Sequence, residues 1–286
     1  MHKISFPVLD AAAAEAAVVV LNSPSLPQAL AVTWFETPPA GYVVEAYYEA
    51  AVSLDAIEQA LAGAHIGKLA VHRVPDQNWV ALSQASLPPV AAGRFIVHGS
   101  HDRGRFVFRR GAIEIDAGEA FGTGYNATTT LCLRAIDLLA RRRRVGRIVD
   151  IGCGTGVLAI AAAKAWPAAR VVAVDNDPIA VTIARENVRS NRLRDRIRVI
   201  EASGLDHHSL RTMASCDLVL ANILPNPLIE MAPAIRKLLV PRGFVILSGL
   251  LAHQVREVAG VYRACGFQLE RRSEEDNWAA LTLLRG

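Results

Sequence analysis

The segment that decides the fold is Val149-Asp150-Ile151-Gly152-Cys153-Gly154-Thr155-Gly156, and Val172-Ala173-Val174-Asp175 follows further along the chain. These residues predict two apolar strands, with a glycine-rich turn after the first strand and an acidic residue at the end of the second. A parallel α/β sheet holds a nucleoside cofactor in this way. Dinucleotide binders read G-x-G-x-x-G, but here the third glycine comes one residue early and Val157 follows it. The segment therefore predicts a Rossmann-like sheet and argues against a dinucleotide.

The acidic residue two places before the first glycine completes a second pattern. Asp150 and the three glycines read D-x-G-x-G-x-G, which resembles the first motif of the S-adenosylmethionine (SAM) methyltransferases. SAM carries no phosphate, so the turn needs no anion site at a helix N-terminus. It needs acceptors for an ammonium group and for ribose hydroxyls. The alternative is a tight strand-to-helix turn without a ligand, because one motif alone has false positives.

Length and composition fit a globular protein of one to two domains. The chain has 286 residues, of which 52% are hydrophobic and 20% are charged. These values suit a soluble protein with a sizeable core. No apolar run reaches the roughly 18 residues of a transmembrane helix, so we expect no membrane span. The net charge of +4 and the pI of about 9.0 permit work near ribosomes or RNA but do not require direct nucleic-acid binding.

The four cysteines, Cys132, Cys153, Cys216 and Cys265, show no C-x-x-C spacing. The sequence therefore indicates neither a disulfide framework nor a zinc site, and we expect no metal. Isolated thiols are typical of the reducing cytosol, so we expect a cytoplasmic protein. Cys153 lies inside the glycine turn, where a small residue fits, and we interpret it as structural.

Residues 1–75 form the first predicted domain. Strands and helices alternate in the order β-α-β-β-α-β, which is that of a ferredoxin-like α+β sandwich. The expected strands are 3–8, 31–36, 42–48 and 68–74, and the expected helices are 11–21 and 54–62. Residues 76–93, which include Pro88, Pro89 and Gly93, look like a linker.

Residues 94–286 form the second predicted domain. Regular strand-helix alternation predicts a doubly wound, mostly parallel sheet, and a terminal hairpin adds an antiparallel strand. Pro178 suits the first turn of a helix, and we expect Gly243 and Gly266 to close helices. The expected strands are 94–98, 111–116, 148–151, 170–174, 198–201, 218–221, 244–247, 268–272 and 279–284, and the expected helices are 128–144, 157–166, 178–190, 228–239 and 253–265.

Arg141–Arg144 is a run of four arginines. One interpretation is RNA binding. The other is a helix C-terminus whose cations oppose the carbonyl end of the helix dipole and face water. We favour the second interpretation, because no aromatic residues interleave with these arginines.

Asp175 ends the second strand, where a carboxylate can accept hydrogen bonds from both ribose hydroxyls of a cofactor. Helix capping is the alternative, because Asp175, Asn176 and Asp177 all precede the helix predicted from Pro178. We expect Asp177 to cap the helix, and Asp175 and Asn176 to belong to the cofactor site. In the next loop, Ser203 marks the place where an adenine could rest.

Asn222 ends the fourth strand of the sheet, at the edge where open α/β sheets bind ligands. Methyltransferases of nucleobases and planar amides commonly read N-P-P-Y here, with the Tyr stacked on the flat nitrogen group. This chain has Ile223 and Leu224 and no Tyr, which favours an aliphatic amine as the acceptor. The Asn222 carbonyl oxygen could orient that amine or the amino end of SAM, and the sequence leaves both open.

Several motifs occur together in one order. They are Ala120-Phe121-Gly122-Thr123-Gly124 with Thr128-Thr129, then Asp150-Ile151-Gly152-Cys153-Gly154, Ala221-Asn222-Ile223-Leu224 and Leu247-Ser248-Gly249. They resemble the PrmA family, the methyltransferases of the eleventh large-subunit ribosomal protein, over about residues 76–286. The resemblance implies a SAM-binding domain, an N-terminal domain that holds the ribosomal protein, and methylation of lysine ε-amines and an N-terminal α-amine.

The candidate site residues follow from these motifs and from the strand ends. Asn222 is the candidate catalytic residue and also a candidate cofactor contact. The full set of candidate cofactor contacts is Phe121, Thr123, Thr129, Asp150, Gly152, Gly154, Asp175, Asn176, Ser203 and Asn222.

The chain departs from the family pattern at one place. The family usually has a histidine shortly after F-G-T-G, where this chain has Asn126. Asparagine does not titrate, so a role as general base is closed to it. It can still donate and accept hydrogen bonds, and it tolerates the left-handed conformation that a loop after Gly124 could need. We expect Asn126 to shape this loop.

We expect a monomeric enzyme that methylates a protein amine with SAM. A free lysine needs about 4–5 kcal/mol to be neutral at pH 7, and burial and the sulfonium charge both lower its pKa. No dedicated base is then obligatory, and most of the rate comes from positioning. The alternatives are another protein lysine or a small amine as acceptor, and an inactive SAM-binding module.

Overall fold

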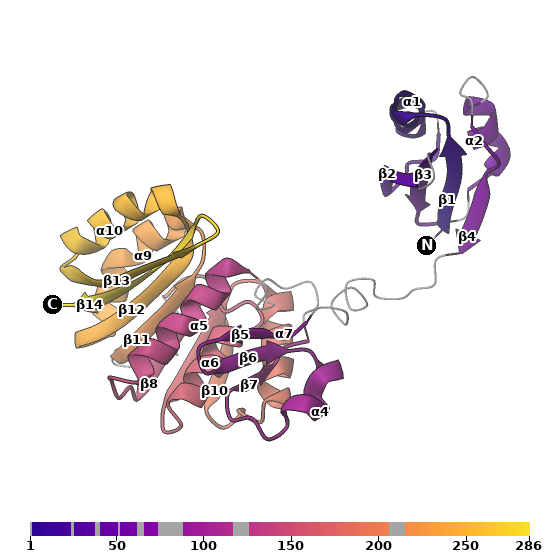
Figure 1. Ribbon diagram of the computed structural model, residues 1–286. Coiled ribbons are helices and arrows are strands. Elements are labelled where there is room, and N and C mark those ends of the chain that lie inside the picture. Colours follow the sequence, from indigo (N-terminus) through magenta and orange to yellow (C-terminus); the bar gives the residue numbers. More distant parts are fainter. Residues whose placement is uncertain are drawn as a thin grey trace. The chain divides into compact units, whose positions relative to one another are not determined.

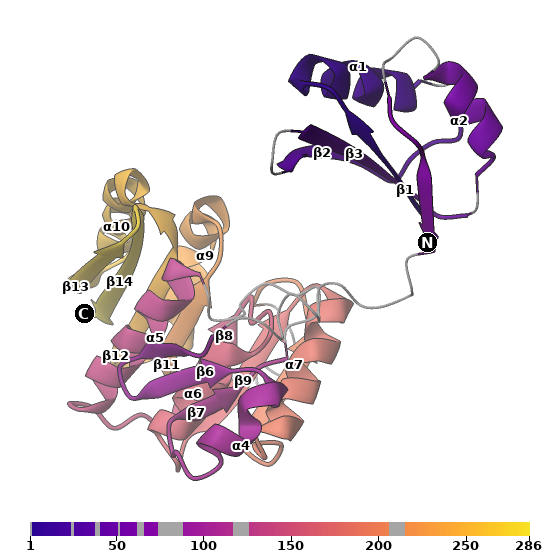
Figure 2. The ribbon, with the colours of Figure 1, turned by 45° about the vertical axis from the view of Figure 1, so that its right-hand side comes forward.

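The computed structural model describes residues 2–23, 26–37, 41–50, 52–61, 66–73, 88–116, 126–205 and 215–286. The chain divides into two compact units, Met1–Asn78 and Trp79–Gly286. Figures 1 and 2 show the elements of each unit. Each unit has a hydrophobic core of its own, so each is described by itself.

The first unit is a four-stranded antiparallel sheet with two helices. The strand order is β2-β3-β1-β4. Ile4, Phe6 and Val8 alternate along β1 and are buried against the helices. The Asp10 carboxylate accepts a hydrogen bond from the Ala13 N–H at 2.8 Å and begins α1. The order of elements agrees with the expected one: β1 (His2–Val8), α1 (Ala11–Leu21), β2 (Ala31–Thr37), β3 (Gly41–Tyr48), α2 (Leu54–Ala60) and β4 (Ala70–Arg73).

The second unit is built on a seven-stranded sheet with the order β10-β9-β8-β11-β12-β14-β13. β14 is antiparallel to both of its neighbours, and the other adjacent pairs are parallel. The prediction of a mostly parallel sheet with an antiparallel terminal hairpin is therefore confirmed. The strands are β8 (Arg147–Ile151), β9 (Arg170–Asp175), β10 (Ile197–Glu201), β11 (Cys216–Asn222), β12 (Leu239–Leu251), β13 (Phe267–Glu275) and β14 (Trp278–Arg285).

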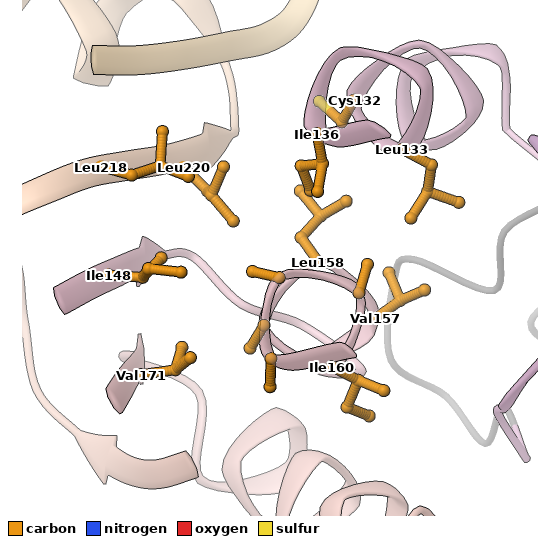
Figure 3. Close-up of a cluster of buried hydrophobic side chains, with 14 of the residues drawn as sticks. Cys132, Leu133, Ile136, Ile148, Val157, Leu158, Ile160, Val171, Leu218 and Leu220 are labelled. Atoms are coloured by element: carbon orange, nitrogen blue, oxygen red, sulfur yellow. The ribbon is translucent and has the colours of Figure 1, made fainter. Parts of the chain in front are cut away.

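Helices cover both faces of this sheet. α5 (Ala127–Ala140), α6 (Val157–Ala165) and α7 (Pro178–Ser190) pack on one face, and α9 (Pro225–Leu238) and α10 (Val255–Ala264) pack on the other. Figure 3 shows part of the first interface, where Ile136 of α5 approaches Leu158 of α6 and strand residues such as Leu220 and Ile148 lie to one side of them. These side chains are almost fully buried, and this packing fixes the turns that connect strands to helices.

A small three-stranded sheet precedes the main sheet. It consists of β5 (Val90–Ala92), β6 (Phe95–His98) and β7 (Ala112–Glu114), and the short helices η1 (Ser100–Asp102) and α4 (Arg103–Phe106) lie between β6 and β7. The Arg94 guanidinium joins it to α5 through Asp137 at 2.5 Å. β5 falls within the range 76–93 that was expected to be a linker, and it pairs with β6.

Three helix boundaries test the sequence signals. Pro178 follows the Asp177 cap and begins α7, and Gly266, with φ +82°, follows α10, so both predictions are confirmed. The prediction that Gly243 closes a helix is wrong. α9 ends at Leu238 and β12 begins at the next residue, which leaves Gly243 inside the strand. The glycine is needed there because a Cβ would lie 2.8 Å from the Val240 carbonyl oxygen.

Candidate cofactor and substrate site

A cavity of about 840 Å³ opens at the carboxyl ends of β8, β9 and β11. The glycine turn, the ends of β9 and β11, the start of α5 and the β13–β14 turn contribute to its walls. Open α/β sheets bind their ligands at this edge. The volume lies in the range of pockets that enclose a ligand of cofactor size.

The glycine turn gives the cavity a backbone floor. Gly152, Gly154 and Gly156 have φ values of +64°, +51° and +79°, which side chains rarely tolerate. A Cβ on Gly152 would lie 2.3 Å from Ile223 Cγ2, and one on Gly156 would lie 3.4 Å from Ala184 Cβ. The first glycine therefore lets the residue after β11 approach the turn, and the third lets α6 pack against α7.

Asp175 holds this turn from the end of β9. Its Oδ2 accepts a hydrogen bond from the Gly154 N–H at 2.8 Å, and its Oδ1 accepts one from the Asp177 N–H at 3.1 Å. An ionised carboxylate can accept about four hydrogen bonds, so Asp175 keeps capacity for a ligand. Asp177 accepts from the Ile179 N–H at 2.8 Å and caps α7, as predicted. Asn176, next to Asp175, also lines the cavity.

Asn222 and Thr129 present unpaired oxygen atoms at the cavity. Asn222 Nδ2 donates to Thr128 Oγ1 at 3.3 Å. Asn222 Oδ1 and Thr129 Oγ1 are buried and have no hydrogen-bond partner within the described part of the chain. A buried polar atom without a partner costs about 1–3 kcal/mol. Two such oxygens beside a cavity indicate that a bound molecule supplies the missing donors.

Asp150 does not line the cavity, although the sequence predicts it as a cofactor contact. It is 1% exposed, and its Oδ2 accepts a hydrogen bond from the Ala159 N–H at 2.9 Å. Burial raises the pKa of this carboxyl to about 8, and the nearby Asp175 charge adds to the rise. The side chain therefore supports α6 from beneath the turn and is mostly uncharged at neutral pH.

The remaining predicted contacts have different positions. Ser203 is exposed and is not part of the cavity wall. Phe121 and Thr123 lie outside the described residues. Cys153 lines the cavity but is buried, and burial raises its thiol pKa well above the usual value. A thiol that keeps its proton is a poor nucleophile, which supports the structural interpretation of Cys153.

Asn126 lines the cavity as the N-cap residue of α5. Its φ of −85° and ψ of 137° are extended, so the tolerance of asparagine for left-handed conformations is not used at this residue. Its carbonyl accepts from the Thr129 and Thr130 N–H groups at 3.0 and 3.1 Å, but its side chain makes no capping bond. The backbone thus begins the helix, and the amide side chain stays available at the cavity.

Sequence reasoning missed the contribution of the β13–β14 turn. Asp276 and Trp278 line the cavity. Asp276 and Asn277 have φ values of +49° and +64°, as in a two-residue hairpin turn. The Arg134 guanidinium of α5 holds Glu275, beside this turn, at 2.6 Å. The Asp-Asn pair between two predicted strands was the available signal, since β14 is antiparallel and therefore begins at the carboxyl edge.

The cavity has an acidic wall. Asp175, Asp177 and Asp276 line it, and none of its described lining residues is Lys, Arg or His. Such a wall favours cations, among them sulfonium and ammonium groups. Over the described ranges, no group of three or more His, Cys, Asp or Glu could hold a metal ion. No helix of these ranges is long and apolar enough to cross a membrane.

Comparisons with known proteins agree on one family. The model of the ribosomal protein L11 methyltransferase (PrmA) family matches residues 12–285. The ribosomal protein L11 methyltransferases of Rhodopseudomonas palustris (strain BisB5) and Bradyrhizobium diazoefficiens are 39% and 41% identical to this chain, with 99% of this chain and 97% of each relative covered. The crystal structure of a ribosomal protein L11 methylase from Lactobacillus delbrueckii subsp. bulgaricus is similar at a TM-score of 0.62 and 27% identity, over 70% of this chain and 99% of that one. This chain belongs to the ribosomal protein L11 methyltransferase family.

Proposed function

We propose that this protein transfers methyl groups from SAM to amines of ribosomal protein L11, at lysine side chains and the N-terminal α-amine. The observation that carries the proposal is the acidic cavity with the unpaired Asn222 Oδ1 beside it. Membership of the family supplies the reaction class, and the names of the relatives supply the acceptor protein.

The residues of the cavity suit SAM as the cofactor. The glycine turn offers backbone without side chains, and Asp175 can accept from ribose hydroxyls. Thr129 Oγ1 and Asn222 Oδ1 can accept from the ammonium group of the methionine part. When bound, SAM supplies a methyl group on a positively charged sulfur that needs no further activation.

The acceptor amine has to lose its proton and point its lone pair at the methyl carbon. Part of the cavity wall is apolar and consists of Ile223, Leu224 and Trp278. Desolvation beside this wall lowers the pKa of a lysine amine. The Asp276 carboxylate is exposed, so it can accept from a lysine that arrives charged. Asn222 Oδ1 can then accept from the neutral amine and fix its direction, which is the positioning that accelerates such a transfer.

The first unit, Met1–Asn78, is proposed to recognise the ribosomal protein. A small acceptor would not need a second unit, whereas a protein acceptor benefits from a surface outside the cavity. The fragment Trp79–Gly286 contains the complete described cavity wall. It should therefore bind SAM with near-native affinity and lose most methylation of L11. Full retention of protein methylation would refute this division of labour.

The direct test is a transfer assay with methyl-labelled SAM and purified ribosomal protein L11, followed by mass spectrometry of the product. We expect label on lysine ε-amines and the α-amine. The matched control is L11 with its amines chemically acetylated beforehand, which should take up none. Calorimetry with SAM separates the alternatives. SAM binding without transfer to any ribosomal protein would identify a binding module, and transfer only to another protein would change the acceptor.

A further inference from the structure

The amino ends of the parallel strands carry a row of arginines. Arg144 and Arg147 lie at the start of β8, Arg170 begins β9, and Arg194 and Arg196 precede β10. Arg196 is half-buried and the other four are exposed. Among the described residues, none of the five forms an ion pair with a carboxylate, so their charges remain available.

Hydrogen bonds join the loops that carry these arginines into one surface. Arg147 and Arg170 are register partners on β8 and β9. Arg196 Nη1 donates to the Pro167 carbonyl at 2.5 Å, and the Arg170 guanidinium donates to the Asp195 carbonyl. The loops 141–147, 166–170 and 191–196 therefore lie side by side at one edge of the sheet, here named the arginine edge (Figure 1).

Few acidic groups offset this charge. Asp217 lies at the arginine edge, but its Oδ2 already accepts from the Gly146 and Arg147 N–H groups at 2.8 Å each. Asp195 is the other carboxylate of the loops that form the edge. Helix-dipole compensation explains Arg141, which pairs with Asp137 at 2.9 Å. The arginines of the β9 and β10 loops follow the C-termini of α6 and α7, but within the described residues none of them pairs with a carboxylate as Arg141 does.

Backbone geometry does not explain the arginines either. Arg192 and Arg242, which extend the same edge, have φ values of +58° and +61°. Glycine or asparagine adopts this conformation at lower cost. The charged side chain is therefore present in spite of the turn geometry.

An exposed aromatic residue lies next to this edge. The segment Arg103-Gly104-Arg105-Phe106-Val107-Phe108-Arg109-Arg110 interleaves arginines with aromatic residues. The Phe108 side chain is 97% exposed, and Arg109 and Arg110 form no ion pair in the described part of the chain. Phe106, in contrast, packs on His98 with 4.9 Å between ring centroids. Phe106 thus has a structural contact that Phe108 lacks.

The segment 103–110 reaches the same end of the sheet as the arginine edge. This segment leads into β7. Asn191, which follows α7, forms hydrogen bonds with both backbone groups of one β7 residue. Asn191 Nδ2 donates to the Glu114 carbonyl at 2.7 Å, and its Oδ1 accepts from the Glu114 N–H at 3.2 Å. Arg192 and Arg194 follow directly in the chain. At the other end of β7, Gly111 lies against the Arg94 carbonyl oxygen, and Arg94 and Arg141 both pair with Asp137. The segment 103–110 therefore leads to the same end of the unit as the loop 141–147, and we treat the two as one surface.

We propose that this surface binds RNA, with phosphates on the arginines and an unpaired base stacked on Phe108. Arginine supplies several donors in a fork that matches phosphate oxygens. Exposed aromatic rings among cations are the platforms on which proteins stack unpaired bases. An acidic protein would satisfy the arginines but would leave the aromatic ring without a matching partner. RNA accounts for both features.

The RNA surface is separate from the methyl-transfer cavity. The five residues of β8 span about 16 Å between the two edges of the sheet. The carboxyl edge is acidic and would repel phosphates, whereas the arginine edge would attract them. RNA and a methyl acceptor could therefore be held on the same unit at one time.

The test measures binding of a fluorescent single-stranded RNA 20-mer to the full chain by anisotropy over a range of salt concentrations. The variants are Phe108→Ala and the double variant Arg144→Glu with Arg194→Glu. The matched control is Lys68→Glu with Arg256→Glu, two exposed cations at other places that change the net charge equally. Labelled polyglutamate is the second probe. SAM affinity of every variant serves as the check of folding.

We expect Phe108→Ala to weaken RNA binding about 5- to 150-fold, as stacking substitutions do. The arginine double variant should reduce the slope of log affinity against log salt by about 1.4, because two phosphate contacts are lost. The control and the SAM affinities should stay unchanged. Absence of RNA binding by the wild type, an equal loss in the control, or equally tight binding of polyglutamate would overturn the proposal.

Discussion

The two edges of the seven-stranded sheet carry opposite charge and have different shapes, although the same strands form both. At the carboxyl edge, the left-handed positions of the turn after β8 are glycines, and Gly152 and Gly156 leave room for Ile223 and Ala184. At the arginine edge, the left-handed positions Arg192 and Arg242 keep long charged side chains. The first edge is a concave acidic surface, and the second is a basic surface that projects into solvent. Glycines in the turn after β8 therefore open the cofactor cavity, whereas retained arginine side chains build the surface for a polyanion.

The largest expected effect concerns Asp150, the buried carboxyl beneath the glycine turn of the carboxyl edge. Burial raises the folded pKa of Asp150 to about 8, above the ordinary value of 3.8. A raised folded pKa contributes stability at low pH that is lost as the pH rises towards 8. Between pH 5 and pH 8 this group should lower the free energy of unfolding by at most about 4 kcal/mol. Asp150→Asn cannot ionise and should flatten the profile.

Urea unfolding at several pH values between 5 and 8 checks this expectation for wild type and Asp150→Asn. The variant keeps an oxygen that can accept from the Ala159 N–H, so the comparison isolates the charge. Parallel profiles for the two proteins would show that Asp150 carries no proton of its own in this range.

A second prediction compares one carboxylate from each edge. Asp175→Ala should weaken SAM binding about 10- to 150-fold, from the ~1.5–3 kcal/mol of hydrogen bonds to a charged group. Asp217→Ala should leave SAM affinity unchanged and lower the free energy of unfolding by about 1 kcal/mol, because the Gly146 and Arg147 N–H groups lose their acceptor. Calorimetry and urea unfolding measure the two quantities. Equal SAM affinity of both variants would remove Asp175 from the cofactor site.

A third prediction concerns the unpaired oxygen of the carboxyl edge. Asn222→Ala should lower kcat about 5- to 30-fold, equivalent to ~1–2 kcal/mol for one hydrogen bond made in the transition state. Thr128→Ala should have a smaller effect in the same direction, because Thr128 only orients the Asn222 amide. Steady-state kinetics with L11 give kcat and KM. A loss confined to SAM affinity, with kcat retained, would assign Asn222 to the amino end of the cofactor.

The smallest expected effect is at Asn126. Asn126→Ala should cost tenfold or less in turnover, as for one net hydrogen bond of ~0.5–1.5 kcal/mol, since the backbone of this residue already begins α5. Asn126→His should be tolerated. Turnover of wild type and both variants at saturating SAM is the measurement. An inactive wild type that Asn126→His restores would mean that the family histidine is required.

The sequence predicted those parts of the fold that depend on local signals. The conformations of the glycine turn, the Asp177 cap and Pro178 are each determined by a few neighbouring residues, and the structure has the predicted conformation at all three. The burial of Asp150 was not predictable, because its depth depends on α6 and the neighbouring strands. Trp278 was missed for a similar reason. The Asp276-Asn277 pair signals the hairpin turn, but the place of Trp278 in the cavity wall depends on where β14 enters the sheet, which sequence periodicity does not reveal.

Trp278 also gives this protein an intrinsic optical signal. The indole is half-buried in the cavity wall, whereas Trp166 is 7% exposed and donates its Nε1–H to the Arg143 carbonyl at the arginine edge. A ligand that enters the cavity removes water from the Trp278 ring and brings a positive charge near it, so its emission should shift in wavelength and intensity while that of Trp166 stays constant. Titration with SAM, beside a Trp278→Phe variant, would then report occupancy in real time without a label.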